Sequence, residues 1–354
     1  MQTIHLGTGQ VRNIIAIASG KGGVGKSTVT TNLALTLKQQ GYQVGVLDAD
    51  LYGPSQALMF GRSEKANIEN GYCLPVDRNG IKFISMSAIN AQDGAVVVRA
   101  PIALKIISQF LNSVLWGDLD YLLIDLPPGT GDIQLSLAQQ VKLNGVVIVT
   151  TPQKVAIEIS RKGLEMFNTV NVPILGVVEN MSGFTCSHCE KVTAIFKEAG
   201  GAKLAQEQHV PFLGAIPLNP LIMMSADEGV SLFEANENSL PAQAFKHIAE
   251  RLNEELENVS SPIVPIETIV SKDTGKLKIR WSDDQESELD PYSLRVKCPC
   301  ASCVDEDTGK KIIKEKDVSS KIGIKEVRTV GQYGLGVTFS DGHSTGIYKY
   351  SHLR

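Results

Sequence analysis

A glycine-rich loop near the start of this 354-residue sequence has the residues needed to bind phosphate. Positions 20–27 read GKGGVGKS and match the pattern G-x-x-x-x-G-K-[ST], between an apolar run and a helical pattern. In such loops backbone N–H groups surround phosphate oxygens, and the following helix adds the positive end of its dipole. We expect Lys26 to reach the β- and γ-phosphates of ATP and Ser27 to coordinate Mg²⁺. The predicted nucleotide-binding residues are Gly20, Lys21, Gly22, Gly23, Val24, Gly25, Lys26, Ser27 and Thr28.

Acidic residues end two other apolar runs. Asp125 ends the run YLLID, which is the usual position of the carboxylate that holds Mg²⁺ or its water. Asp48 and Asp50 end the run VLDAD, and one of them could orient the attacking water; alone, either could instead cap a helix or lie in a solvated turn. The loop LPPGTGD after Asp125 is stiff and glycine-hinged, which suits sensing of the γ-phosphate. Lys26 and these acids form the core of the predicted catalytic set.

Cysteines form a second group of candidate ligands. They comprise one isolated residue, a C-x-x-C pair and a C-x-C-x-x-C triplet: Cys73; Cys186 and Cys189; Cys298, Cys300 and Cys303. Clusters of this kind in an intracellular chain favour metal or redox chemistry over disulfides. The C-x-x-C pair supplies two thiolates, whereas a [4Fe–4S] cluster takes four, so a two-fold dimer could hold one cluster on its axis. Tetrahedral zinc satisfies the same count, and a redox dithiol is a further alternative.

The cysteine triplet needs a fourth ligand to close a structural zinc site. His343, in the turn FSDGH, is the best candidate, and His352 is a weaker one. A small unit of about 90 residues would gain stability from such a metal. A second iron–sulfur or delivery site is the alternative interpretation.

The elements that must position these residues follow an alternating pattern. Continuous apolar strands separated by helices predict an α/β fold, a mostly parallel sheet with helices on both faces. We expect strands at 13–19, 43–48, 81–86, 121–125, 145–151, 173–179 and 211–216. We expect helices at 26–40, 101–114, 132–141, 154–169, 192–206 and 240–257.

The pattern changes after residue 257. Ser260, Ser261, Pro262 and Pro265 mark a linker, and beyond it short strands alternate with Asp-Gly and Thr-Gly turns. We therefore expect a P-loop domain at 1–257, a linker at 258–265 and a small β-rich, zinc-binding domain at 266–354.

Composition narrows the class of protein. The net charge is -4 with no long basic run, which argues against nucleic acid or anionic lipid as a partner. No apolar stretch approaches the ~18 residues of a membrane span. We expect a cytoplasmic chain with no nucleic-acid or membrane partner.

The phosphate loop with its extra lysine, Lys21, resembles the deviant Walker A motif of dimeric ATPases typified by MinD, ParA and nitrogenase reductase. The resemblance implies a homodimer in which Lys21 reaches the partner's phosphates, as an arginine finger does. It therefore adds Lys21 to the predicted catalytic residues, Lys26, Asp48, Asp50 and Asp125. A solvated loop lysine is the simpler alternative.

Residues 179–189, ENMSGFTCSHC, resemble the E-N-M-S-x-x-x-C-x-x-C motif of the Mrp-type (ApbC-like) iron–sulfur carrier ATPases. Residues 48–55 and 116–132 match the same family, and the resemblance covers roughly 11–257, although VRAP at 98–101 stands where W-R-G-P is usual. It implies a slow ATPase that holds a labile [4Fe–4S] cluster on Cys186 and Cys189 of two subunits. The implied partners are apo iron–sulfur proteins and assembly scaffolds, and Asn180 is implied to contact adenine.

Residues 281–343 resemble the N-terminal zinc domain of gamma-butyrobetaine hydroxylase, which implies that Cys298, Cys300, Cys303 and His343 bind Zn²⁺. Two other functions stay open. A positioning ATPase of the MinD or ParA type would share the nucleotide site but should carry an amphipathic tail or a DNA-binding surface. A zinc-dependent, ATP-switched interaction protein would hold zinc at both cysteine clusters.

Overall fold

The computed structural model describes most of the chain, as two compact units, Met1–Ser260 and Ser261–Arg354. The described residues are 4–6, 9–50, 59, 67–69, 72–85, 100–129, 131–185, 192–196, 199–228, 231–260, 265–271, 274–300, 302–304, 311–330 and 334–354.

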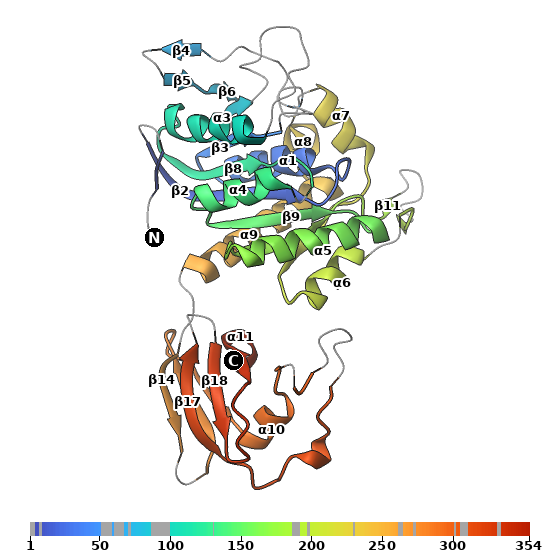
Figure 1. Ribbon diagram of the computed structural model, residues 1–354. Coiled ribbons are helices and arrows are strands. Elements are labelled where there is room, and N and C mark those ends of the chain that lie inside the picture. The colour runs from blue at the N-terminus through green and yellow to red at the C-terminus, as the bar shows by residue number, and fades with distance from the viewer. Residues whose placement is uncertain are drawn as a thin grey trace. The chain divides into compact units, whose positions relative to one another are not determined.

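The first unit is built on one nine-stranded sheet (Figure 1). Its strands are β1 (Ile4–Leu6), β2 (Gly9–Ser19), β3 (Val44–Asp48), β6 (Val76–Arg78), β7 (Ile81–Ser85), β8 (Leu119–Asp125), β9 (Gly145–Thr150), β10 (Ile174–Glu179) and β13 (Phe212–Ala215). The order is β13-β10-β9-β2-β8-β3-β7-β6, with β1 beside β2. Neighbouring strands from β13 to β7 run parallel. At the edges, β6 is antiparallel to β7, and β1 is antiparallel to β2. This confirms the predicted, mostly parallel sheet.

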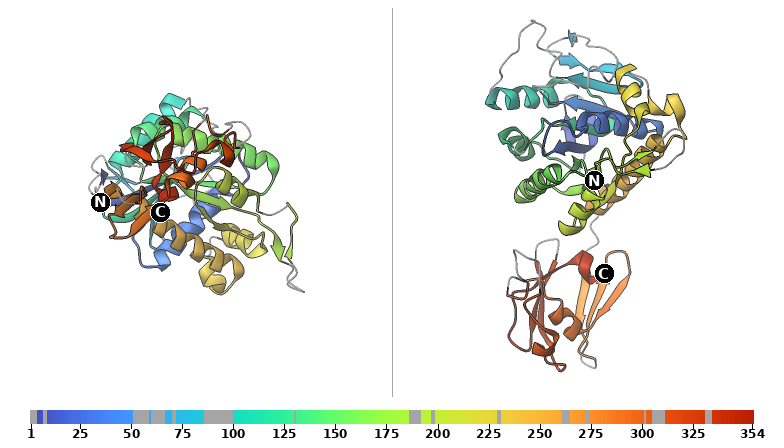
Figure 2. Two further views of the ribbon diagram at one scale, coloured as in Figure 1. Left: turned by 90° about the horizontal axis from the view of Figure 1, so that it is seen from below. Right: turned by 90° about the vertical axis from the view of Figure 1, so that its right-hand side faces the viewer.

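Helices cover both faces of this sheet (Figures 1 and 2). One layer is α1 (Lys26–Gln39), α7 (Pro220–Glu228), α8 (Leu232–Asn236) and α9 (Leu240–Ser260). The other layer is α3 (Ala100–Ser113), α4 (Asp132–Gln140), α5 (Lys154–Thr169) and α6 (Gly200–Glu207). A small pair, β4 (Asn67–Glu69) and β5 (Tyr72–Leu74), forms a sheet of its own.

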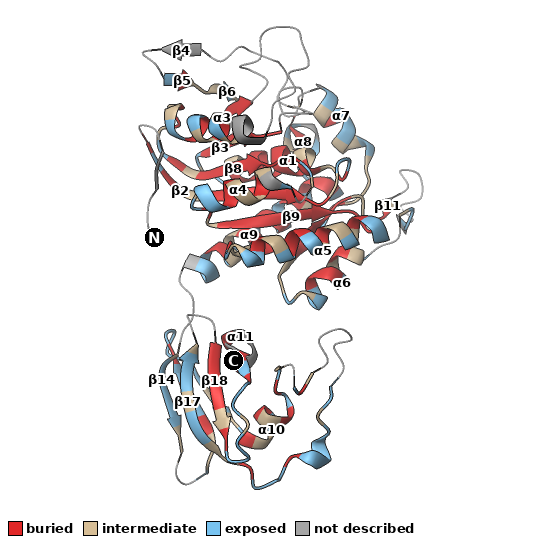
Figure 3. Ribbon diagram, in the orientation of Figure 1, coloured by how far each residue is buried: buried red, intermediate tan, exposed pale blue. Residues whose placement is uncertain are grey.

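Burial on both faces explains the continuous apolar runs in the sequence. In β2 the side chains of Ile14 and Ala16 belong to one core, and those of Ile15 and Ile17 belong to the other. The strands β2, β8 and β9 are accordingly buried through most of their length (Figure 3). A rigid sheet therefore fixes the strand ends from which the candidate site residues project.

The second unit contains two three-stranded antiparallel sheets, in line with the predicted β-rich fold. They are β14 (Pro265–Val270), β15 (Leu277–Trp281) and β16 (Glu286–Leu289), and β17 (Ile324–Val330), β18 (Gly334–Phe339) and β19 (Ile347–Lys349). The helices are α10 (Pro291–Val296) and α11 (Tyr350–Leu353), with a 3₁₀ turn at Glu315–Asp317. Trp281 and Phe339 are fully buried in its core.

One predicted helix is wrong in its first half. Residues 192–206 were expected to be helical, but Val192–Thr193 form a strand, β12, that pairs with β11 (Phe184–Thr185), and the helix begins only at Gly200. Val192 and Thr193 are β-branched, which favours a strand. Ala199, at φ 60°, then turns the chain before the glycine pair at 200–201. Among the described residues, no helix is both long enough and apolar enough to cross a bilayer.

Candidate nucleotide site and metal centre

The glycine-rich loop connects the end of β2 to the start of α1 and forms a cavity of about 230 Å³. Gly23 and Gly25 have φ values of 77° and 82°, a region that glycine enters without steric cost. A side chain at 25 would also collide with Asn180, whose Nδ2 lies 2.1 Å from where a Cβ would stand. The cavity is lined by Ser19, Lys21, Gly22, Gly23, Val24, Gly25, Lys26, Ser27, Thr28, Asp50, Met59 and Pro128.

Lys26 and Asp125 form a buried ion pair beside this cavity. The Lys26 Nζ donates to Asp125 Oδ1 at 2.6 Å, with side-chain exposures of 6% and 0%. Thr30 Oγ1 donates to the same carboxylate oxygen at 3.0 Å. The structure thus brings the two expected phosphate and magnesium residues together. Thr30 was missed, although its position four residues after Lys26 puts both on one face of α1.

Asp48 lies beside Asp125, because β3 and β8 are neighbours and these two residues are paired in register. Asp48 is fully buried and accepts from the Asp50 backbone N–H at 3.1 Å and from Ser85 Oγ at 3.0 Å. Burial, followed by the negative charge of Asp125, raises the pKa of Asp48 from 3.8 to about 7. Asp50, in contrast, lines the cavity. The two acids of the VLDAD run therefore have different surroundings.

The raised pKa of Asp48 predicts a pH-dependent stability. The folded chain holds the Asp48 proton more tightly than the unfolded chain, and this binding stabilises the fold. The contribution to the free energy of unfolding is fully present below about pH 4 and is lost as the pH rises through about 7. Raising the pH from 5 to 8 should therefore lower the free energy of unfolding of the wild type relative to Asp48→Asn. Urea denaturation without nucleotide or Mg²⁺ would measure this, with the exposed Asp118→Asn as the matched control. If the free energies of unfolding of the wild type and Asp48→Asn differ by the same amount at pH 5 and pH 8, the raised pKa of Asp48 is contradicted.

Lys21 lies at the rim of the phosphate cavity. It is half-buried, and its Nζ donates to Gln153 Oε1 at 3.5 Å. Gln153 immediately precedes α5 and was not among the expected site residues. Gly20 lets the loop approach α5, because a Cβ there would stand 2.7 Å from the Ile159 backbone. The structure therefore places the extra lysine at the nucleotide cavity, beside the start of α5.

Asn180 directly follows β10 and contacts the phosphate loop. Its Nδ2 donates to the Val24 carbonyl at 2.9 Å, and only 6% of the residue is exposed. It lines a second cavity of about 290 Å³, which shares Gly25, Thr28 and Met59 with the first. Cys186 and Cys189 lie outside the described residues.

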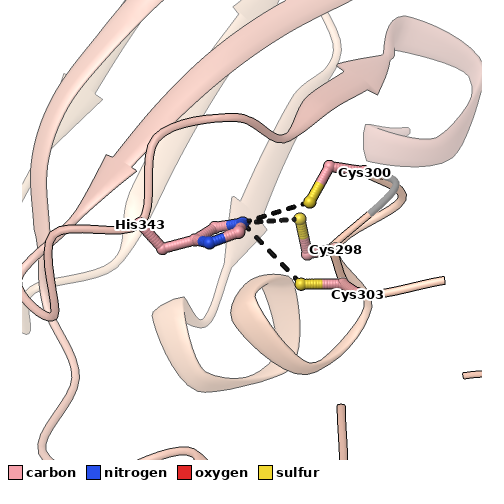
Figure 4. A group of neighbouring side chains, drawn as sticks. All are labelled: Cys298, Cys300, Cys303 and His343. Carbon is pink, nitrogen blue, oxygen red and sulfur yellow. Dashed lines mark hydrogen bonds between the residues drawn. The ribbon is translucent and has the colours of Figure 1, made fainter. Parts of the chain in front are cut away.

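The second unit brings Cys298, Cys300, Cys303 and His343 together (Figure 4). His343 Nε2 lies 3.2, 3.4 and 3.8 Å from the sulfur atoms of Cys298, Cys300 and Cys303. The four ligand atoms all lie within 4.8 Å of one another. The side chain of His352 lies outside the described part of the chain.

This donor set fits tetrahedral zinc. Zn–S and Zn–N bonds of about 2.3 and 2.0 Å put nitrogen and sulfur about 3.5 Å apart in a tetrahedron, which is close to the three observed distances. Gly346 leaves room for the centre, because a Cβ there would stand 2.7 Å from Cys298 Sγ. Three cysteines and one histidine with no open position are typical of a structural site.

The surroundings of the centre act in opposite directions on two of its cysteines. Arg295 donates from Nη1 to Cys303 Sγ at 3.3 Å and from Nε to Asp341 at 2.8 Å, and Asp341 accepts from the His343 backbone N–H at 3.0 Å. Burial raises the pKa of Cys298 to about 12. Although burial acts in the same direction at Cys300, hydrogen bonds with Thr345 and the neighbouring cysteines lower its pKa to about 7. A metal ion must therefore displace a tightly held proton at Cys298.

Two family models match the chain. Residues 10–253 match the family described as NUBPL iron-transfer P-loop NTPase, and residues 268–354 match gamma-butyrobetaine hydroxylase-like, N-terminal. An iron–sulfur cluster carrier protein from Pseudomonas fragi is 46% identical over 246 residues, which cover 69% of this chain and 86% of the relative. An Arabidopsis thaliana iron–sulfur protein required for mitochondrial NADH dehydrogenase is 41% identical over 71% of this chain and 81% of the relative. These matches confirm both resemblances seen in the sequence.

Solved structures are similar to the first unit. A nucleotide-binding protein from Archaeoglobus fulgidus in complex with ADP is 39% identical, with a TM-score of 0.57 over 63% of this chain and 88% of that chain. The cell-division ATPase MinD from Pyrococcus furiosus is 22% identical, with a TM-score of 0.52 over 68% of this chain and 98% of its own. The second likeness concerns the fold alone.

Proposed function

Because the chain belongs to the family of iron-transfer P-loop NTPases that includes the iron–sulfur cluster carrier proteins, we propose that it is an ATP-hydrolysing carrier. It would hold an iron–sulfur cluster between two subunits and pass it to apo-proteins. The observation that carries the nucleotide part is the phosphate-loop cavity with the buried Lys26–Asp125 pair beside it. A cation and a carboxylate in this place are what a nucleotide phosphate and its Mg²⁺ require.

Each residue of the nucleotide site has a role in this proposal. Lys26 would bind the β- and γ-phosphates, and Ser27 and Asp125 would hold Mg²⁺, which would supply positive charge to the phosphates. Asp50 lines the cavity and is suited to orient the attacking water, whereas Asp48 is buried beside Asp125 and has a pKa raised to about 7. Lys21 would act on the nucleotide of the partner subunit. Asn180, which already contacts the phosphate loop, would contact the adenine ring.

Cys186 and Cys189 supply the cluster ligands. Two thiolates from each of two subunits give the four that a [4Fe–4S] cluster takes. A cluster shared between subunits is easier to release than one enclosed by a single chain, which suits transfer to apo-proteins or uptake from a scaffold. The Cys298, Cys300, Cys303 and His343 centre would hold Zn²⁺ as a structural ion, in a unit that recognises such a partner.

Anaerobic reconstitution tests the proposal. The wild type and a Cys186→Ser/Cys189→Ser variant are incubated with iron and sulfide, desalted, and analysed for iron, sulfide and zinc. We expect about four irons per dimer and a broad absorption band at about 400 nm in the wild type, and neither in the variant. About one zinc per chain should remain in both proteins. Transfer to an apo-ferredoxin, followed by its spectrum, then tests the carrier step.

The opposite result would point to a different function. A wild type without iron, and with about three zinc ions per dimer, would contradict the carrier proposal. It would favour an ATP-switched interaction protein that uses zinc at both cysteine clusters.

A further inference from the structure

A buried carboxylate stands at the end of β10. Glu179, the last residue of this strand, is fully buried. Its Oε1 accepts from Ser182 Oγ at 2.5 Å and from the Ala199 backbone N–H at 3.2 Å, and its Oε2 accepts from the Gly201 backbone N–H at 2.5 Å. Burial of a carboxylate is costly unless such bonds compensate it, so its place in the structure calls for an explanation.

The three donors come from the two ends of one chain segment. Ser182 precedes β11, and Ala199 and Gly201 follow β12, which pairs with β11 (Figure 1). Cys186 and Cys189 fall between β11 and β12 in the sequence. The Glu179 carboxylate therefore links Ser182, before the segment that carries the two cysteines, to Ala199 and Gly201 after it. We call residues 186–191 the cysteine segment.

The returning end is shaped around this carboxylate. Ala199, the residue before α6, has a φ of 60°, which an alanine adopts only at a cost, and its side chain cannot cap the helix. The Glu179 carboxylate instead binds the free N–H groups at the start of α6. A Cβ at Gly201 would stand 3.0 Å from Glu179 Cβ, so glycine allows the close approach.

Ser182, at the end that precedes the cysteine segment, is held by backbone hydrogen bonds as well. The Ser182 backbone N–H donates to the Ile216 carbonyl at 2.9 Å, and the Ile216 N–H donates to the Glu179 carbonyl at 2.8 Å. Among the hydrogen bonds of the described residues, only the Ser182 hydroxyl links this end to the Glu179 side chain. Ser182 can therefore be altered without disturbing the contacts at α6.

From this geometry we infer that Glu179 is the positioning residue of the cysteine segment. It fixes the distance between Ser182 and the start of α6, and together with the pairing of β11 and β12 it holds the base of the segment that carries the two cysteines. The inference rests on the proposed function, because it takes Cys186 and Cys189 as the cluster ligands. Glu179 acts through the backbone on either side of the cysteines, by its bonds to Ser182, Ala199 and Gly201.

Glu179→Gln tests the inference. The amide replaces one acceptor oxygen by an NH₂ group, which then opposes one of the three donors. The reconstituted variant should lose its cluster about tenfold faster than the wild type when an iron chelator is added, as expected for loss of a charged hydrogen bond. Its electron paramagnetic resonance spectrum in the reduced state should broaden, because the thiolates are held less uniformly. Glu165→Gln, on the exposed side of α5, is the matched control and should behave as the wild type.

Two milder variants decide the case if Glu179→Gln fails to fold. Ser182→Ala removes one of the three bonds and should shorten the cluster lifetime about threefold, while Ser182→Thr keeps the hydroxyl and should restore it. A lower melting temperature with unchanged cluster lifetime and spectrum in Glu179→Gln, or equal lifetimes in the two Ser182 variants, would overturn the inference. A wild type that takes up no cluster would instead overturn the proposed function.

Discussion

Replacing Lys26 by methionine is expected to reduce ATP hydrolysis at least about a hundredfold, because the phosphates lose their main cation. It should also destabilise the first unit by about 3–5 kcal/mol, because Asp125 is left buried without its ion-pair partner. The Thr30 hydroxyl would remain as a donor to Asp125 Oδ1, but it carries no charge. Phosphate release and urea denaturation measure the two effects separately.

A double variant separates the two causes. Lys26→Met/Asp125→Asn removes both charges, so it should recover part of the lost stability while hydrolysis stays abolished. Lys162→Met, at an exposed position of α5, controls for the substitution itself. Hydrolysis that survives in Lys26→Met, or a double variant no more stable than the single one, would contradict the assigned pair.

Replacing Cys298 by serine is expected to remove zinc from the second unit and to destabilise it strongly. Cys298 is fully buried at the centre of the four-ligand group, and a serine hydroxyl is a poor zinc ligand. In small zinc domains the free energy of metal binding is largely free energy of folding, so the melting temperature of this unit should fall by at least about 10 °C. Zinc analysis after desalting gives the metal content.

The two tryptophans allow each unit to be followed. Trp281 is buried in the second unit and Trp116 in the first, so Trp116→Phe leaves the fluorescence of Trp281 as the probe. Cys73→Ser, the same substitution at an isolated cysteine of the first unit, should leave zinc content and Trp281 unfolding unchanged. Retention of zinc by Cys298→Ser, with an unchanged Trp281 transition, would contradict a structural metal centre.

The sequence was sufficient for the fold and for much of the nucleotide site, because local patterns determine both. Apolar runs buried on both faces identify parallel strands, and the carboxyl ends of such strands meet at one edge. Lys26, Asp48 and Asp125 could therefore be expected near one another, and the structure places them so. The ligand count of zinc likewise directed attention to His343, which lies 40 residues beyond Cys303 and beside it in space.

Residues that act through tertiary contacts could not be predicted in this way. Glu179 looks like the polar end of a strand, and only the fold brings Gly201 to its carboxylate. Gln153 meets Lys21 because α5 starts beside the phosphate loop. The prediction of a helix at 192–206 was wrong for a related reason, because pairing with β11 outweighs the weak helical pattern of Val192 and Thr193.

The Cys298, Cys300, Cys303 and His343 centre draws all four donor atoms from one chain. Its occupancy is therefore independent of how many copies of the protein are present. A cluster held by two thiolates from each of two subunits would also depend on protein concentration, because dilution separates the subunits and favours its loss. The chain would then keep its zinc at any abundance, while the amount of protein in the cell would itself regulate how much iron it carries.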